Sequence, residues 1–312
     1  MAFYTELDQQ ELLAMLRDYG IDALTACTGA SDGIENTTYF LESDAQKWIL
    51  TLFEEISAGE LPFFVRLMDW LYARQLPVAH ALADNNAKTL HTLSNKPALL
   101  FPRLSGQHPR NMTIEQCRAI GYFLGHMHAV SQNYPEQRDN QRGTAWMQAA
   151  RQRLSSCVDA EVLELLDAQI RNAEQVRALN LPTGLIHGDL FHDNALYEGD
   201  TLCGVIDFYN ACTDVLALDL AIVINDWCAL PDGSIEATRY HAIIDAYQKQ
   251  RALTVQEKTH WQAILQLAAA RFWLSRLLSE KLPARPDVVH AHKPSAEYRA
   301  RLQFHAAHAL AL

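Results

Sequence analysis

The order of apolar and polar residues divides the chain into two parts with different periodicities. In the first part, short runs rich in β-branched and aromatic residues, bounded by turn-forming residues, have the character of strands. There are four such runs: residues 37–42, 47–53, 90–93 and 97–101. Residues 6–19 and 61–75 instead repeat apolar residues every three to four positions, as helices with one buried side do; in 6–19 these are Leu7, Leu12, Leu13, Leu16 and Tyr19. We therefore predict that residues 1–102 form a small antiparallel sheet with a packed helix.

The second part of the chain has helical periodicity almost throughout. Thr113 is followed by Gln116, the spacing of a capping box, at the start of an apolar helix that extends to His128. Further helical segments are 163–179, 216–228, 236–250 and 255–282. The change of character near residues 101–104 predicts an α+β protein with two lobes, 1–102 and 103–312. Ligands commonly bind where two such domains meet.

One short stretch of the second part carries the residues best suited to chemistry. Asp189 and Asn194 lie in the sequence LIHGDLFHDN, and Asp207 follows an apolar run further on. The turn residues 198–200 between two short strands predict a β-hairpin that places Asn194 beside Asp207. An amide oxygen and a carboxylate suit Mg²⁺, which keeps waters and substrate phosphates among its ligands. Asp189 lies just before the hairpin and can orient a hydroxyl nucleophile, so the set predicts a phosphotransferase.

Charge is unevenly distributed around this stretch. No Lys or Arg occurs between Arg177 and Arg239, whereas the same span holds ten Asp and Glu residues. Such an acidic segment would repel nucleotide phosphates unless cations were bound with them, and divalent metal ions are the simplest such cations. The alternative is an ordinary solvated acidic surface. Asp207 argues against this alternative because it directly follows an apolar strand.

The composition is that of a globular enzyme and argues against several classes of function. Of the 312 residues, 49% are hydrophobic and 20% are charged, and the net charge of −11 disfavours nucleic acid and anionic membranes as main partners. No apolar run approaches the length of a transmembrane helix, and the first residues lack the regions of a signal peptide. The six cysteines form no CxxC pair, which favours reduced thiols and a cytoplasmic location.

Several stretches carry a resemblance to a known family. Besides the segment from Asp189 to Asn194 and the sequence IDFY at 206–209, they are GIENTTYFL (33–41), LTLFE (50–54), NDWC (225–228) and RFWLSRL (271–277). On these residues the chain resembles the kinase-like small-molecule phosphotransferases, the group of the aminoglycoside and choline kinases, over nearly its whole length. Within this group it is most similar to the homoserine kinases. The Asp–Asn–Asp set is specific to the superfamily, whereas the other stretches favour homoserine kinase.

The resemblance implies a two-lobed, protein-kinase-like fold and a role for each matching residue. Asp189 would be the catalytic base or orienting group, Asn194 and Asp207 would bind Mg²⁺, and Asp219 would brace the catalytic loop. The loop that begins at Ser31 would cover the phosphates of ATP, and the backbone near Phe101 would meet the adenine. The residues that would line the nucleotide site are Ser31, Asn36, Thr37, Lys47, Thr51, Phe101 and Arg103.

One departure from the family's pattern concerns the phosphates. Many relatives carry a basic residue late in the third strand, where this chain has Thr51, and the acidic residue that would pair with it falls near Val65. Lys47 is on the same strand face but four residues earlier, about 13 Å away at ~3.3 Å per residue. We therefore expect Ser31, its neighbours in the loop and backbone donors to contribute more than Lys47 does.

The resemblance also implies the acceptor. Homoserine carries a hydroxyl, an ammonium and a carboxylate, so its recognition needs a basic residue together with polar or acidic groups. Arg271 and Arg276 lie in an apolar helix, where an arginine needs a carboxylate partner. We expect an internal partner such as Asp219 or Asp226 for one arginine, and the substrate carboxylate for the other. The residues expected to bind substrate are Tyr209, Asn225, Asp226, Trp227, Arg271 and Trp273.

The chain is accordingly expected to transfer the γ-phosphoryl group of ATP, with Mg²⁺, to L-homoserine, which yields O-phospho-L-homoserine for threonine biosynthesis. Two alternatives stay open. The acceptor could be another small alcohol of the choline, methylthioribose or aminoglycoside type, although choline would require an aromatic cage. The chain could also be a catalytically inactive, kinase-like binding protein. The intact Asp–Asn–Asp set argues against that alternative, and the missing strand lysine favours it.

Overall fold

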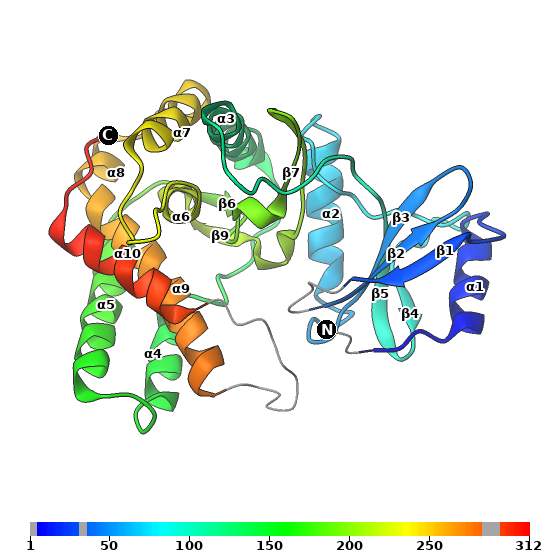
Figure 1. The fold of residues 1–312 in the computed structure, drawn as a ribbon, viewed down its shortest axis with the longest axis horizontal. Helices are drawn as coiled ribbons and strands as arrows, with labels where there is room; N and C mark the ends of the chain where they lie inside the picture. Colours follow the sequence, from blue (N-terminus) through cyan, green and yellow to red (C-terminus); the bar gives the residue numbers. More distant parts are fainter. Residues whose placement is uncertain (1–4, 31–35, 283–293) are drawn as a thin grey trace. The chain divides into compact units, whose positions relative to one another are not determined.

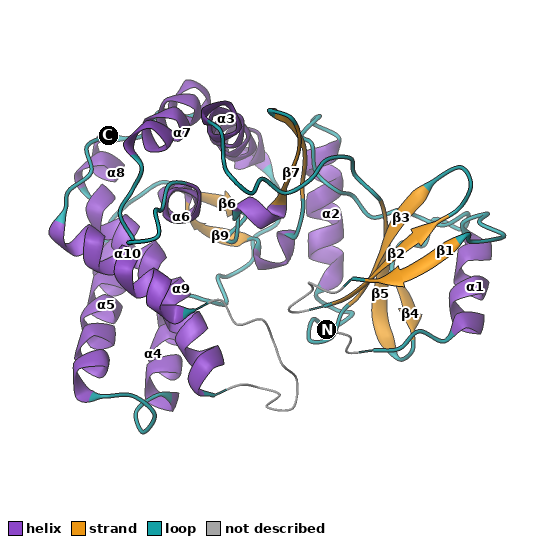
Figure 2. Ribbon diagram, in the orientation of Figure 1, coloured by secondary structure: helices purple, strands orange, loops and turns teal. Residues whose placement is uncertain are grey.

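The computed structural model describes residues 5–30, 36–282 and 294–312, which pack into two compact units. The first unit extends to Ser105 and the second begins at Gly106. Figure 1 follows the chain through its helices and strands, and Figure 2 separates the two kinds of element by colour. The first unit contains a sheet and the second is mainly helical, so the predicted α+β class is confirmed.

Five antiparallel strands form the sheet of the first unit, in the order β1-β2-β3-β5-β4. They are β1 (Ala26–Gly29), β2 (Thr37–Glu42), β3 (Lys47–Leu52), β4 (His91–Leu93) and β5 (Lys96–Pro102). The two predicted strand pairs are confirmed as β2–β3 and β4–β5, whereas β1 was not predicted. Ser94 and Asn95 close the second hairpin with positive φ angles of 47° and 61°. Asn adopts this left-handed conformation more readily than most residues do.

Two helices, α1 (Gln9–Asp18) and α2 (Leu61–Tyr72), confirm the helices predicted for this unit. Figure 1 shows them on opposite sides of the sheet. Helix α1 packs Leu12, Met15 and Leu16 into a core with strand residues such as Leu50. The prediction that Leu13 belongs to this buried side is wrong, because Leu13 is 38% exposed and the i, i+3, i+4 face that meets the sheet includes Met15 instead.

Eight helices are described in the second unit. They are α3 (Ile114–Val130), α4 (Thr144–Arg153), α5 (Ala160–Ala178), α6 (Leu216–Trp227), α7 (Ala237–Gln250), α8 (Val255–Thr259), α9 (Trp261–Lys281) and α10 (Ser295–Ala307). The capping box of Thr113 and Gln116 is confirmed at the start of α3. The single helix expected over 255–282 is instead α8 followed by α9, because the backbone leaves the helical conformation at His260. Helices α4 and α10 were not predicted.

Two small antiparallel sheets connect these helices. Strand β6 (Thr183–Ile186) pairs with β9 (Cys212–Val215), and β7 (Ala195–Glu198) pairs with β8 (Thr201–Val205). The second pair confirms the predicted hairpin, and its turn contains Gly199 with a φ of 60°. The following helix α6 is buried along its whole length and lies in the middle of the second unit in Figure 1. Residues on α6 can therefore support both small sheets from within.

Two further features concern the predicted cellular location. No helix in the described part of the chain combines the length and the apolar character needed to cross a membrane. All six cysteines are free thiols, and Cys117, Cys212 and Cys228 are buried. A cytoplasmic location stays a prediction from the sequence.

Candidate active site

The loop from His187 to Asn194 connects β6 to β7 and carries two of the three predicted active-site residues. Gly188 turns the chain with a φ of 78°, and a Cβ atom there would lie 2.7 Å from the carbonyl oxygen of Asn210. Glycine is therefore required at this position. The third residue, Asp207, follows β8 and has a left-handed backbone, with φ 64° and ψ 55°. A non-glycine residue adopts this conformation at a cost on the order of 1 kcal/mol, which functional sites often carry.

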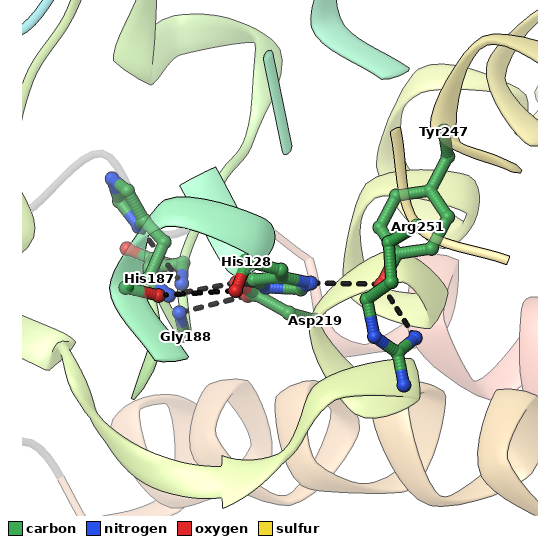
Figure 3. Close-up of polar contacts among 8 residues, drawn as sticks. His128, His187, Gly188, Asp219, Tyr247 and Arg251 are labelled. Carbon is green, nitrogen blue, oxygen red and sulfur yellow. Dashed lines mark hydrogen bonds and ion pairs between the residues drawn. The ribbon is translucent and has the colours of Figure 1, made fainter. Parts of the chain in front are cut away.

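Asp219 braces this loop from the first turn of α6, as predicted. Its fully buried carboxylate accepts the backbone N–H of His187 at 2.7 Å and that of Gly188 at 2.9 Å (Figure 3). His128 of α3 donates a further hydrogen bond to Asp219 through Nε2, at 3.2 Å. Burial alone would raise the pKa of Asp219, but the hydrogen bond and charge interaction with His128 lower it below its usual value. The loop is thus tied to a buried carboxylate through its main chain.

A chain of buried polar groups continues from Asp219 through His128 to Tyr247 and Arg251 at the end of α7 (Figure 3). The hydroxyl of Tyr247 lies 2.8 Å from Nδ1 of His128 and accepts a hydrogen bond from Arg251 at 2.9 Å. Arg251 also pairs with Glu257 at 2.7 Å. Burial lowers the pKa of His128, so the ring is neutral, with Nε2–H directed to Asp219 and Nδ1 accepting from Tyr247. Each member of the chain fixes the orientation of the next.

His187 links the loop to the strand that leads to Asp207. Its Nδ1 accepts the backbone N–H of Asp189 at 3.2 Å, and its Nε2 lies 3.0 Å from the carbonyl oxygen of Ile206. Since one nitrogen accepts, the other carries the proton and donates. Burial lowers the pKa of His187, which keeps this arrangement neutral. The expectation of a structural hydrogen bond from His187 to the loop is confirmed.

Asn194 and Asp207 offer the oxygen atoms predicted to bind a metal. The side-chain amide of Asn194 donates to the carbonyl oxygen of Asp189 at 2.8 Å, so its Oδ1 is available as an acceptor. The backbone N–H of Ile206 donates to the carbonyl oxygen of Asn194 at 3.0 Å, which brings Asp207 next to Asn194 as the hairpin argument predicts. One amide oxygen and one carboxylate form a small set of hard donors, and this set fits Mg²⁺.

Arg271 of α9 reaches the loop from the other side. It is only 6% exposed, and its NH1 donates to the carbonyl oxygen of Gly188. Burial lowers the pKa of Arg271, and the carboxylate of Asp189 is the strongest influence in the opposite direction. No carboxylate of the described residues forms an ion pair with this guanidinium. Arg271 therefore contacts the catalytic loop, and the carboxylate of Asp189 stabilises its charge without forming an ion pair with it.

Arg276, the second arginine of this helix, has an internal partner. It pairs with Glu297 of α10 at 2.6 Å and donates to the carbonyl oxygen of Pro294 at 3.1 Å. Asp219 and Asp226 were the partners expected, and that expectation is wrong for both arginines. The carboxylates of Asp219 and Asp226 are instead occupied by loop N–H groups and by histidines.

Asp226 and Trp227 hold the second half of the loop. The carboxylate of Asp226 accepts both the backbone N–H and the Nδ1–H of His192, each at 2.7 Å. The indole N–H of Trp227 donates to the carbonyl oxygen of Leu190 at 3.1 Å. Both side chains are buried, as is Trp273, while Tyr209 lies two residues after Asp207. Their contact with a substrate stays a prediction; in this structure Asp226 and Trp227 position the loop.

Asn225 is fully buried and connects three helices. Its amide nitrogen donates to the carbonyl oxygens of Ala221 and Leu265, at 3.0 and 3.1 Å. Its Oδ1 accepts from Nε2 of His305, on α10, at 2.8 Å. All three bonds are internal, so a contact between Asn225 and a substrate would replace one of them. The predicted substrate role of Asn225 stays untested, and the structure gives it a role in joining α6, α9 and α10.

His305 makes the stability of the protein dependent on pH. Burial lowers the pKa of His305 to about 4, whereas an unfolded histidine has a pKa of about 6.5. As the pH falls below 6.5 the unfolded chain binds a proton that the folded state rejects, so stability is lost until the pH reaches the folded value. Linkage predicts a loss of about 2 kcal/mol between pH 7.5 and 5 from this residue. Urea unfolding of wild type and His305→Gln at both pH values measures it, and an equal loss in the two proteins would contradict the assignment.

The predicted nucleotide residues of the first unit occupy one sheet. Side chains alternate along a strand, so Lys47, Thr51 and Phe101 share the face opposite α1. Thr37, at the start of β2, is buried and donates to Glu54 at 2.7 Å, and Asn36 directly precedes it. Ser31 lies outside the described residues. Thr51 is therefore on the same sheet face as Phe101, as the resemblance requires of nucleotide ligands.

The basic residues on this sheet face lie far from Thr51. Lys47 starts β3 and pairs with Glu42 at 3.2 Å, and Arg103 pairs with the same carboxylate at 2.9 Å. Sequence reasoning missed one further cation, Lys96, which pairs with Glu54 at 3.0 Å. Lys96 is on the strand face that α1 covers, so it does not replace the basic residue missing at Thr51.

Comparison with known proteins agrees with this geometry. The model of the phosphotransferase enzyme family matches residues 26–254, and the chain belongs to that family. The homoserine kinase of Methylobacillus flagellatus is 39% identical over 295 residues, which are 95% of this chain and 92% of the relative. The homoserine kinase of Pseudomonas aeruginosa is 38% identical over 304 residues, 97% of this chain and 96% of the relative. The resemblance noted in the sequence is thereby confirmed.

Solved structures share the fold at much lower identity. An amicoumacin kinase in complex with AMP-PNP, Ca²⁺ and its ligand superposes with a TM-score of 0.72 at 15% identity, covering 96% of this chain and 94% of the other. The choline kinase LicA from Streptococcus pneumoniae superposes with a TM-score of 0.67 at 12% identity, and the superposition covers 96% of this chain and 100% of the LicA chain. The fold is therefore that of kinases for small molecules.

Proposed function

We infer that this chain is a homoserine kinase, which transfers the γ-phosphoryl group of ATP to the side-chain hydroxyl of L-homoserine. Relatives that carry this name match the chain over nearly its full length at 36–39% identity. The observation that carries the reaction type is the braced loop, in which Asp189 and Asn194 are fixed by main-chain and side-chain hydrogen bonds beside Asp207. The products are O-phospho-L-homoserine and ADP.

Asp189 acts on the acceptor hydroxyl. Its carboxylate accepts the hydrogen bond of the hydroxyl and takes the proton as the oxygen bonds to the γ-phosphorus. The bond between that phosphorus and the β,γ-bridging oxygen breaks, and the electron pair leaves with ADP. Because the main chain of Asp189 is held at both its N–H and its carbonyl oxygen, the backbone that carries the carboxylate is fixed before substrate arrives. Such positioning is the main contribution a protein makes to phosphoryl transfer.

Asn194 and Asp207 would hold Mg²⁺, each through one oxygen-bearing side chain. When bound there, Mg²⁺ neutralises charge on the nucleotide phosphates. Asn194 has a second task, because the same side chain donates to the carbonyl oxygen of Asp189. The proposed metal ligand and the main chain of the catalytic residue are therefore connected by a single hydrogen bond. In the first unit, Asn36, Thr37, Thr51 and Phe101 are the proposed nucleotide contacts.

Lys47→Ala should change activity little. Lys47 and Arg103 both neutralise Glu42. Lys47 is the first residue of β3, whereas Thr51 lies near the last residue of this strand, which pairs with the start of β2. Removal of an exposed ion pair typically costs little in stability or function. We expect KM for ATP and kcat to stay within about threefold of wild type, the scale of a weak surface interaction. A loss of several orders of magnitude in steady-state assays would show that Lys47 grips the phosphates.

The test of the proposed function is an ADP-release assay with Mg²⁺ that compares homoserine, choline, methylthioribose and kanamycin. Homoserine should give the highest kcat/KM. Efficient phosphorylation of choline or kanamycin without activity on homoserine would overturn the acceptor and leave the phosphotransferase assignment intact. Binding of ATP without turnover of any of the four alcohols would favour the inactive binding protein instead.

A further inference from the structure

A small cavity in the second unit is lined in part by Arg271, which also contacts the catalytic loop. Its walls come from the segment before α4 and from α4, α5, α6 and α9, and its polar lining consists of Asn140, Arg142, Thr144, Arg177 and Arg271. The cavity has an empty volume of about 240 Å³, its opening to solvent included. The enclosed part of this space has room for only about one water-sized group, so the cavity can take one end of a small polar molecule and not a whole ligand.

The charged lining of the cavity is entirely positive. Three arginines line it, whereas no Asp or Glu does. Arg177 is neutralised from outside the lining by Asp214, at 2.7 Å. The guanidinium of Arg142 forms no hydrogen bond or ion pair with any residue that the structure describes, and faces the ring of Trp146 at 5.1 Å. Arg271 uses one nitrogen on a carbonyl oxygen, so two guanidinium groups retain donors for an anion.

Neutral donors at the start of α4 point to the same kind of ligand. Gly143 is the N-cap residue and provides no side chain to satisfy the N–H groups of the first turn. The hydroxyl of Thr144 is buried and makes no hydrogen bond within the described residues. A helix N-terminus favours negative charge through these N–H groups and its dipole. An anion in the cavity would therefore give a partner to the guanidinium of Arg142 and to the hydroxyl of Thr144, and it could also use the remaining donors of Arg271.

The position of Arg271 relates the cavity to the reaction. Arg271 donates to the carbonyl oxygen of Gly188, the residue before Asp189, and the carboxylate of Asp189 favours its charged form. Arg271 thus belongs to the lining of the cavity and also contacts the loop that carries Asp189. We propose that it binds the carboxylate of an amino-acid acceptor, with Arg142, Arg271 and Thr144 as ligands. This proposal rests on the proposed function and names the site that distinguishes homoserine from an amino alcohol.

The matched substrate for the test is 3-amino-1-propanol, which is homoserine without its carboxylate. Arg142→Ala should lower kcat/KM for homoserine about 10- to 100-fold, mostly through KM, since a hydrogen bond to a charged group is lost. The same substitution should leave kcat/KM for 3-amino-1-propanol and KM for ATP within about twofold, because neither involves that bond. Thr144→Val should have a smaller effect in the same direction. The control is Arg153→Ala, which removes an exposed arginine from the last turn of α4, the helix that begins two residues after Arg142.

A competitive inhibitor that cannot be phosphorylated tests the same carboxylate site through binding alone. L-2-Aminobutyrate has the ammonium and carboxylate of homoserine but no hydroxyl, so it should inhibit the wild type in competition with homoserine. Its inhibition constant should rise about 10- to 100-fold in Arg142→Ala and stay unchanged in Arg153→Ala.

The possible results separate this proposal from the function on which it rests. Equal losses for homoserine and 3-amino-1-propanol in Arg142→Ala would overturn the carboxylate site, because they would indicate a structural role. Unchanged kinetics with homoserine would overturn it as well. In both cases the kinase would still act on homoserine. A wild-type enzyme that phosphorylates 3-amino-1-propanol or choline but not homoserine would overturn the proposed function together with the site.

Discussion

Replacing Asp189 by Asn should lower kcat for homoserine phosphorylation by about 10²–10⁴-fold, the range that a positioned general base contributes. The amide can accept a hydrogen bond from the acceptor hydroxyl, but it cannot take the proton. The loop should keep its shape, because its bonds to His187 and Asn194 use the main chain of Asp189 and not its carboxylate. Steady-state kinetics and calorimetric titration with ATP in the presence of Mg²⁺ measure the two effects, and ATP affinity should change little.

Asp207→Ala is the informative comparison for this prediction. Asp207 faces the nucleotide's metal in the proposed site, so its loss should weaken ATP binding in Mg²⁺ as well as turnover. Asp189 handles only the hydroxyl. Equal losses of ATP affinity in the two variants would contradict this division of roles, even if both enzymes were inactive.

Asp219→Ala should reduce the free energy of unfolding by about 3–5 kcal/mol, the cost of removing one partner from a buried charged interaction. The substitution leaves the N–H groups of His187 and Gly188 and the Nε2–H of His128 without an acceptor in a fully buried place. A domain typically has only about 5–15 kcal/mol of stability, so the variant is expected to unfold at much lower urea concentration. Turnover by the folded fraction should also fall, because the loop that carries Asp189 loses its anchor.

Two control variants separate this effect from a general loss of charge. Asp219→Asn keeps one side-chain oxygen for the loop and should be more stable than Asp219→Ala. Asp167→Ala removes a carboxylate that pairs with Arg151 near the surface and should change the urea midpoint little. A urea midpoint for Asp219→Ala equal to that of wild type would show that the loop does not depend on this carboxylate.

Elements with a regular apolar pattern could be predicted, and those without one could not. The β2–β3 hairpin and the helices α3 and α5 follow from local residues. Helix α4 was missed because Met147 and Ala150 are the buried residues of a largely polar segment. The buried side of α10 consists of Ser295, Tyr298, Leu302 and His305, which have helical spacing but mixed polarity. Apolar periodicity does not detect such a helix, because burial there is decided by partners elsewhere in the fold.

The same distinction applies to the site. The hairpin that joins Asn194 to Asp207 spans few residues, and turn chemistry was sufficient to predict it. The support of the loop depends on pairs that are far apart in sequence, such as Asp226 with His192 and Asn225 with His305. The substrate roles predicted for Asn225 and Asp226 stay predictions, but their internal partners could not be predicted, because nothing in the local sequence shows which buried groups will meet them. The cavity that we propose for the carboxylate was missed for the same reason, since its lining comes from four helices and from the segment before α4.

The support of the catalytic loop by α10 has a consequence during synthesis of the protein. The ring of Tyr298 lies 6.2 Å from that of Phe191, between ring centroids, and His305 completes the bonds of Asn225. Ribosomes add about 5–20 residues per second, so roughly 5–20 s separate the translation of the loop from that of α10. During this interval a nascent chain already contains Asp189, Asn194 and Asp207. It still lacks α10, which contacts the ring of Phe191 and the side-chain amide of Asn225 in the folded protein. We therefore expect the active site to be complete only after α10 has been translated.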